Sequence, residues 1–102
     1  TIRRDINIYS SDNSSYLYLK RRAFIKKIVL DSYGLRGAAM YHVVVDKDVK
    51  GTIYVPGRDP RYVVTIEAYT DEIEFRPIWG DALITQVKVI EREPISYKPY
   101  SR

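Results

Sequence analysis

The chain contains no cysteine, and His42 is the single histidine among its 102 residues. The missing thiols exclude disulfide bonds, thiolate zinc sites and cysteine nucleophiles together. The sequence also has no glycine-rich phosphate loop and no pair of histidines at metal-ligand spacing. Because His42 lies within the apolar run 39–45, we expect a packed strand residue rather than a catalytic base. These absences predict a protein that is not an enzyme and needs no cofactor.

Long apolar runs are missing as well. No segment approaches the ~18 uninterrupted apolar residues that a membrane-spanning helix requires. The charges near the start, Arg3 and Arg4, are not followed by the apolar stretch of a signal peptide. We therefore expect a soluble protein, made in the cytoplasm, with no membrane partner.

Positive charge and tyrosine are abundant. The net charge is +4, and ten residues are tyrosine. Such a composition can indicate nucleic-acid binding, because cations neutralise phosphates and aromatic rings stack on bases. Tyrosine is also favoured in strands and at protein interfaces. The densest positive cluster, which fits either a phosphate contact or a solvated face, consists of Lys20, Arg21, Arg22, Lys26 and Lys27.

A strand rhythm extends from Ile25 to Ile90. Short alternating apolar runs, such as 40–45 and 62–66, are separated by turns that carry Gly, Pro or Asp. This rhythm predicts an all-β fold, a single-domain antiparallel β-sandwich of the jelly-roll kind with about seven to eight strands. Residues 23–33 also show helical spacing, but their β-branched side chains favour a strand.

Both ends of the chain are separated from this central pattern. Residues 1–15 are expected to be an N-terminal strand or arm, because a polar run follows them. Residues 16–93 are expected to form the sandwich domain. Residues 94–102 are expected to be an extended C-terminal arm, since Pro94 and Pro99 each remove a backbone donor.

Several side chains are candidates for binding. Trp79 lies in an expected loop from Pro77 to Asp81, where it could anchor an interface, stack on a sugar or plug the core. An oxygen-ligand cation site formed by Asp46 and Asp48 with Asp59 or Asp81 competes with simple turn chemistry. Glu72 and Glu74 are expected to share a solvated strand face, with Ile73 and Phe75 facing the core. The interface or ligand candidates are Trp79, Tyr9, Tyr16, Tyr97 and Tyr100.

The order of strands and turns resembles a known kind of module. The segments that carry the resemblance are 24–32, 41–46, 52–57, 72–75 and 83–89, with Gly51 ending one turn. They are similar to the small jelly-roll-like β-sandwich modules of tailed-bacteriophage tail, baseplate and capsid-decoration proteins, which in form are similar to carbohydrate-binding modules.

The resemblance implies a non-enzymatic structural component of a virion. Such a protein would assemble with itself as a symmetric homo-oligomer and with other virion proteins, and its terminal arms would reach neighbouring subunits. A small basic nucleic-acid-binding β-barrel and a glycan-binding module are the alternatives. One tryptophan is fewer than the several ring platforms that a carbohydrate-binding module would offer.

Overall fold

The structure, a computed structural model, describes residues 2–11, 13–56 and 61–91. These residues form one six-stranded sheet with the strand order β1-β6-β2-β5-β3-β4, and every neighbouring pair is antiparallel. The described residues contain no helix, so the predicted all-β antiparallel class is confirmed. The strands are β1 (Ile2–Ile8), β2 (Ser15–Gly34), β3 (Ala39–Val45), β4 (Asp48–Val55), β5 (Arg61–Trp79) and β6 (Ala82–Glu91).

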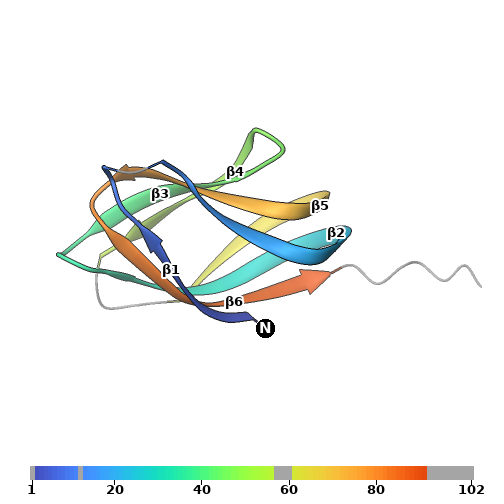
Figure 1. The fold of residues 1–102 in the computed structure, drawn as a ribbon, viewed down its shortest axis with the longest axis horizontal. Coiled ribbons are helices and arrows are strands. Elements are labelled where there is room, and N and C mark those ends of the chain that lie inside the picture. The colour runs from blue at the N-terminus through green and yellow to red at the C-terminus, as the bar shows by residue number, and fades with distance from the viewer. Residues whose placement is uncertain (1, 12, 57–60, 92–102) are drawn as a thin grey trace, which may run out of the picture.

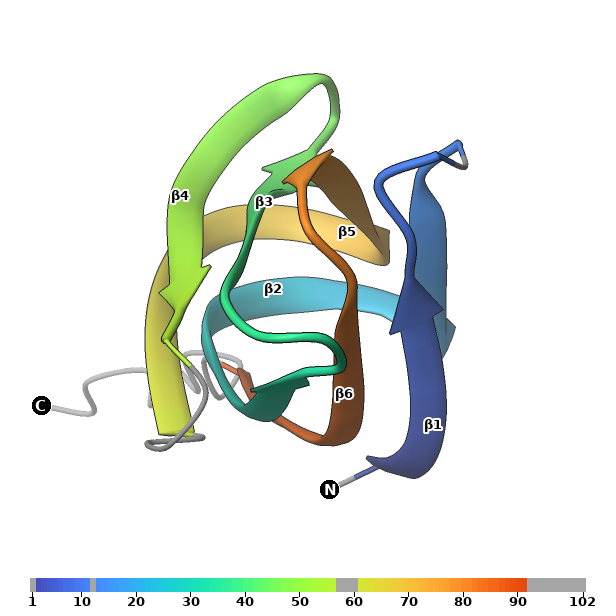
Figure 2. The same cartoon turned by 90° about the vertical axis from the view of Figure 1, so that its left-hand side faces the viewer.

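The sheet curls on itself into a half-barrel. In Figure 1 the strands cross at steep angles, and Figure 2 shows them ranged around a common interior with β4 and β1 on opposite sides. The sequence predicted two packed sheets and more strands, whereas the described residues form six strands of one sheet. The difference has a local cause in the two longest strands.

β2 and β5 are the two longest strands, and both are continuous. Tyr18 pairs with Glu72 and Ala23 pairs with Thr70, so residues 19–22 of β2 lie opposite a single residue of β5. Such a bulge bends a strand and increases its twist without ending it. The sequence predicts a turn at 70–71 between strands at 61–69 and 72–76; in the structure this turn is a bend inside the single long strand β5. The strand that was favoured for residues 23–33 is confirmed as part of β2.

The N-terminal segment belongs to the sheet of its own chain. β1 pairs with β6, from Ile2 opposite Val87 to Ile8 opposite Ala82. Ile8 is fully buried, whereas Asn7 is exposed, as the alternation predicted. Residues 2–8 are thus a strand of the sheet rather than an extended arm. The expected C-terminal arm, 94–102, lies outside the described residues.

The core occupies the interior of the half-barrel. Ile73 and Phe75 are fully buried, as predicted, and the ring of Phe75 meets that of Tyr41 edge-on at a centroid distance of 6.1 Å. Val87 is also buried, while Leu83 is only half-buried. The largest fully buried side chains come from β1, β2, β3, β5 and β6; they include Tyr41, Phe75, Ile8, Leu17, Ile25, Ile28, Leu30, Ile66, Ile73 and Ile84.

Candidate functional site

An aromatic ridge lies on the outer face of β4, β3 and β5. Met40 of β3 pairs with Tyr54 of β4 on one side and with Trp79 of β5 on the other. Tyr54 and Trp79 are 49% and 43% exposed, and their ring centroids lie 6.0 Å apart at an interplanar angle of 60°. With the neighbouring exposed Ile78, these residues present a row of large apolar side chains to solvent. We call Met40, Tyr54, Ile78 and Trp79 the aromatic ridge.

Trp79 is the last residue of β5 rather than part of a loop. Met40 pairs with Trp79 but Tyr41 pairs with Pro77, so Ile78 is an extra residue in the ladder. This bulge leaves Ile78 and Trp79 exposed in succession, which a regular strand would not do. The exposure of Trp79 excludes the prediction that its ring plugs the core.

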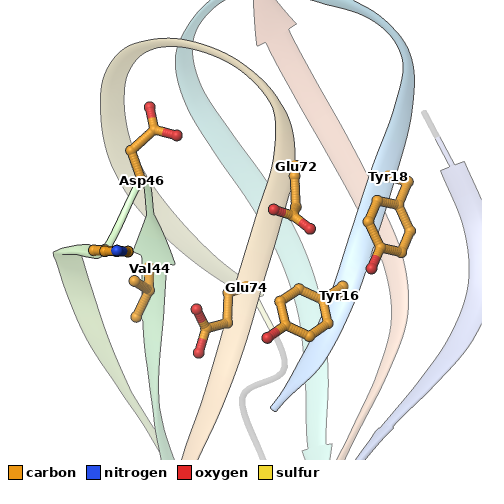
Figure 3. A pocket seen from close by; sticks show the side chains of 7 residues that line it. Tyr16, Tyr18, Val44, Asp46, Glu72 and Glu74 are labelled. Carbon is orange, nitrogen blue, oxygen red and sulfur yellow. The ribbon is translucent and has the colours of Figure 1, made fainter.

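A second feature of the outer face is an open groove of about 540 Å³. Tyr16 and Tyr18 of β2 form one wall, and Glu72 and Glu74 of β5 lie next to them (Figure 3). The turn between β3 and β4 closes the other side. Because three of its side chains are carboxylates and one is an amine, we call it the acidic groove; it is lined by Tyr16, Tyr18, Val44, Asp46, Lys47, Glu72 and Glu74.

Glu74 is the carboxylate of the acidic groove that accepts two side-chain hydrogen bonds. Its Oε2 accepts hydrogen bonds from the Ser14 hydroxyl at 2.5 Å and from Nε of Arg76 at 3.1 Å. Burial by itself would raise the pKa of Glu74, but these two donors and the charge of Arg76 lower the pKa below its ordinary value. Glu74 therefore stays ionised at neutral pH. It is half-buried, whereas Glu72 is exposed to water as predicted.

The two tyrosines of the groove stack on each other. Their ring centroids lie 5.9 Å apart, with an interplanar angle of 20°. Tyr18 is 64% exposed. Desolvation raises the pKa of its hydroxyl, and the negative charge of Glu72 raises that pKa further. The ring of Tyr18 therefore remains a neutral phenol beside a carboxylate.

In the predicted basic cluster, the two arginines lie close to carboxylates of the described residues. Arg21 forms an ion pair with Glu91 at 3.0 Å. Arg22 lies 3.9 Å from a carboxylate oxygen of Asp71, donates to the carbonyl of Tyr69 and places its guanidinium 5.4 Å from that ring's centroid. Lys20 and Lys26 are exposed, and Lys27 is half-buried. We call Lys20, Arg21, Arg22 and Lys26 the basic bulge.

The remaining polar candidates have structural roles. Nδ1 of His42 lies 2.8 Å from the Thr52 hydroxyl, so the ring belongs to a cross-strand pair. Asp46 is a turn residue, and Asp81 accepts a hydrogen bond from the amide of Ser10 at 3.1 Å. In the described part of the chain no three His, Asp or Glu side chains gather in a way that could hold a metal ion. Asp59 lies outside it.

The structure places the tyrosine candidates in different regions. Tyr16 lines the acidic groove, and Tyr9 is exposed just after β1. Tyr97 and Tyr100 lie outside the described residues. Sequence reasoning did not single out Tyr18 or Tyr54. Both follow a detectable signal, since each alternates with buried neighbours: Leu17 before Tyr18, and Ile53 and Val55 around Tyr54.

Within the part of the chain that the structure describes, no helix is long and apolar enough to cross a membrane. In comparisons with known proteins, no family model, no curated protein and no solved structure matches the chain.

Proposed function

We propose that the chain is a non-enzymatic assembly protein, a structural component of a viral particle that acts through protein–protein contacts. The observation that carries this proposal is the aromatic ridge. Tryptophan and tyrosine dominate the binding energy of interfaces, because each buries a large rigid area at a low cost in side-chain entropy. In the ridge, Trp79 and Tyr54 contact each other while roughly half of each side chain faces solvent.

Open strand edges give further support. β3 pairs with β5 only from Glu74 to Trp79, so the first half of β5 has a strand partner on one side only among the described residues. β6 pairs with β2 only from Ile25 onward, which leaves the first half of β2 open in the same way among the described residues. Unpaired edges are surfaces on which another chain can add a strand.

The virion setting rests on the resemblance of the strand-and-turn pattern to phage structural modules. The jelly-roll sandwich and the C-terminal arm that the resemblance implies remain predictions. The C-terminal arm can be tested directly, since every buried side chain of the described core lies between Ile6 and Val87. Deleting residues 94–102 should leave far-UV circular dichroism unchanged and weaken self-association. A truncated chain that fails to fold would assign the tail to the core.

The decisive experiment on the ridge is Trp79→Ala, measured by sedimentation velocity over a concentration series and by thermal unfolding. Removing an aromatic anchor from a contact should weaken association by ~2 kcal/mol or more, about 30-fold in Kd. Because the ring is half-exposed, unfolding should change much less than the ~3–5 kcal/mol expected for a buried tryptophan. Tyr33→Ala is the matched control, since Tyr33 is 40% exposed and belongs to neither the aromatic ridge, the acidic groove nor the basic bulge. A wild-type chain that stays monomeric at every concentration would overturn the proposal.

A nucleic-acid-binding β-barrel is the second candidate. The specific observation in its favour is the basic bulge beside the exposed ring of Tyr69. Phosphate contacts release counterions, so affinity for single-stranded DNA would have to fall steeply with salt. Against this function, the guanidinium of Arg22 already covers that ring. For glycan binding, the neighbours of Trp79 in the ridge are apolar and offer sugar hydroxyls few partners.

A further inference from the structure

We propose that the acidic groove of one copy of this chain binds the basic bulge of a second copy, in a head-to-tail contact. The inference rests on the proposed assembly function and names the surfaces involved. It depends on three observations: the charge of the groove, the aromatic pair in its wall and the position of the cations.

The acidic groove has negative charge that ion pairs among the described residues do not fully neutralise. Its lining carries three carboxylates and one amine, Lys47. Glu74 is paired with Arg76. Neither Asp46 nor Glu72 forms an ion pair with any described residue. An incoming cation would therefore meet two unpaired carboxylates.

The aromatic wall of the acidic groove also suits a positively charged side chain. Tyr16 and Tyr18 present stacked rings beside the carboxylates (Figure 3). A guanidinium or ammonium within about 6 Å of an aromatic face is attracted by the ring's quadrupole. Rings on one wall and carboxylates beside them together favour a lysine or arginine side chain over an anion or an uncharged polymer.

The chain carries a matching surface. Lys20 and Lys26 of the basic bulge are exposed and form no ion pair among the described residues. Arg21 and Arg22 are engaged, but at exposed pairs that are worth little and can exchange partners. Within one copy these arginines reach Glu91 and Asp71, not the groove. Among the described residues, no cation of the basic bulge pairs with a carboxylate of the groove, and we therefore assign the cations that fill the groove to a second copy.

The two surfaces are different, which determines the kind of assembly. A contact between unlike patches is heterologous, so it produces a closed ring or an open filament rather than a two-fold dimer. The contact should also be sensitive to salt, because exposed charges are screened within a Debye length of about 8–10 Å at ordinary ionic strength. The aromatic ridge, being apolar, should not share that sensitivity.

The test uses two charge variants of the full chain and their mixture. The groove variant, Asp46→Asn with Glu72→Lys, leaves the groove with an excess of positive charge. The bulge variant, Lys20→Glu with Lys26→Glu, replaces both unpaired cations by carboxylates. Arg21 and Arg22 stay paired with Glu91 and Asp71, so the unpaired charge of the bulge becomes negative. All four residues are exposed, so circular dichroism should show intact folds. Arg36→Glu with Lys88→Glu is the control for the bulge variant, since it makes the same charge change at two other exposed positions.

At about 50 mM salt each variant alone should associate at least ~10-fold more weakly than the wild type, because its groove and bulge then carry charge of the same sign. The mixture should recover association, since each surface of one variant is complementary to a surface of the other. Sedimentation velocity at low and high salt measures both effects, and the control variant should associate like the wild type.

Three results would count against these ideas, and they are distinguishable. If the control weakens association as much as the bulge variant, net charge rather than this contact is responsible, and the inference fails. If the wild type assembles but the variants and the mixture assemble equally well, the inference fails while the assembly function stands. If the wild type is monomeric under all conditions, the proposed function fails as well.

Discussion

The hydroxyl of Tyr41 donates a 2.8 Å hydrogen bond to Oγ of Ser32, and both residues are fully buried. Tyr41 belongs to β3 and Ser32 to β2, and β5 lies between these strands in the sheet. The bond therefore crosses the interior of the half-barrel instead of following the sheet. It joins the two buried hydroxyls and fixes the distance between β2 and β3 across the interior.

Removing this hydroxyl should destabilise the fold. In Tyr41→Phe the Ser32 hydroxyl stays buried without its partner, which costs about 1–3 kcal/mol in the free energy of unfolding. Adding Ser32→Ala to that variant should cost less than it does in the wild type, because no polar group is then left unsatisfied. Urea denaturation of the two single variants and the double variant measures the coupling. Strict additivity of the two losses would show that the bond contributes nothing.

Alkaline pH should destabilise the protein through the same residue. Burial raises the pKa of Tyr41 far above its ordinary value of 10.0, a rise that the Ser32 hydrogen bond only partly opposes. Below about pH 10 both states keep the proton, so the full stability is present. Above it the unfolded chain releases a proton that the folded chain retains, so stability falls as pH rises.

Unfolding free energies measured between about pH 9 and 11 should decline in the wild type and decline less in Tyr41→Phe. Tyr18→Phe is the comparison, because the pKa of Tyr18 is also raised but its ring is largely exposed. An unchanged alkaline decline in Tyr41→Phe would show that another group is responsible.

The turn between β3 and β4 contains strain that a glycine should relieve. Val45 pairs with Asp48, and the two residues between them, Asp46 and Lys47, have φ of 50° and 70°. A two-residue hairpin turn of this kind favours glycine at its second position. Left-handed backbone costs a lysine about 1–2 kcal/mol. Lys47→Gly should therefore raise the free energy of unfolding by roughly 1 kcal/mol, whereas Lys47→Ala, which keeps a Cβ, should not. Equal effects of the two substitutions would exclude backbone strain as the cause.

Alternation predicted the regular parts of the fold. The burial of Ile8 against exposed Asn7, and of Ile73 and Phe75 against exposed Glu72, follows from the period of two that every strand has. The strand at residues 23–33 was favoured for a similar reason, since its β-branched side chains suit a pleated surface.

From the sequence alone, a bulge inside a strand could not be distinguished from a turn between two strands. Thr70 has turn-like composition, yet it is buried, and its hydroxyl both donates to the carbonyl and accepts from the amide of Glu72 at 3.1 Å. These two hydrogen bonds satisfy the backbone amide and carbonyl of Glu72 at a bend inside β5. The same difficulty applies to the acidic groove, because its residues come from 16–18, 44–47 and 72–74. Only the strand register brings these segments together.

The turn after Trp79 should tolerate no side chain at Gly80. Its φ is 74°, and a Cβ there would lie 2.5 Å from the carbonyl oxygen of Ala38 and 2.8 Å from Cα of Ala39. Both are backbone atoms, so the turn itself would have to move. Left-handed strain of about 1–2 kcal/mol and a clash of about 1–3 kcal/mol together predict a loss of roughly 3 kcal/mol for Gly80→Ala.

Gly51→Ala is the matched control for Gly80→Ala. The backbone of Gly51 does not have a positive φ, and a Cβ there would lie 3.0 Å from a methyl group of Val64. Because a side-chain methyl group can shift more easily than backbone, the loss of stability in Gly51→Ala should be clearly smaller. Thermal unfolding gives both losses. Trp79, the single tryptophan, adds a local readout, because its fluorescence should change in Gly80→Ala if the turn shifts the ring away from Tyr54. Wild-type stability and emission in Gly80→Ala would show that this turn does not hold Trp79 in the aromatic ridge.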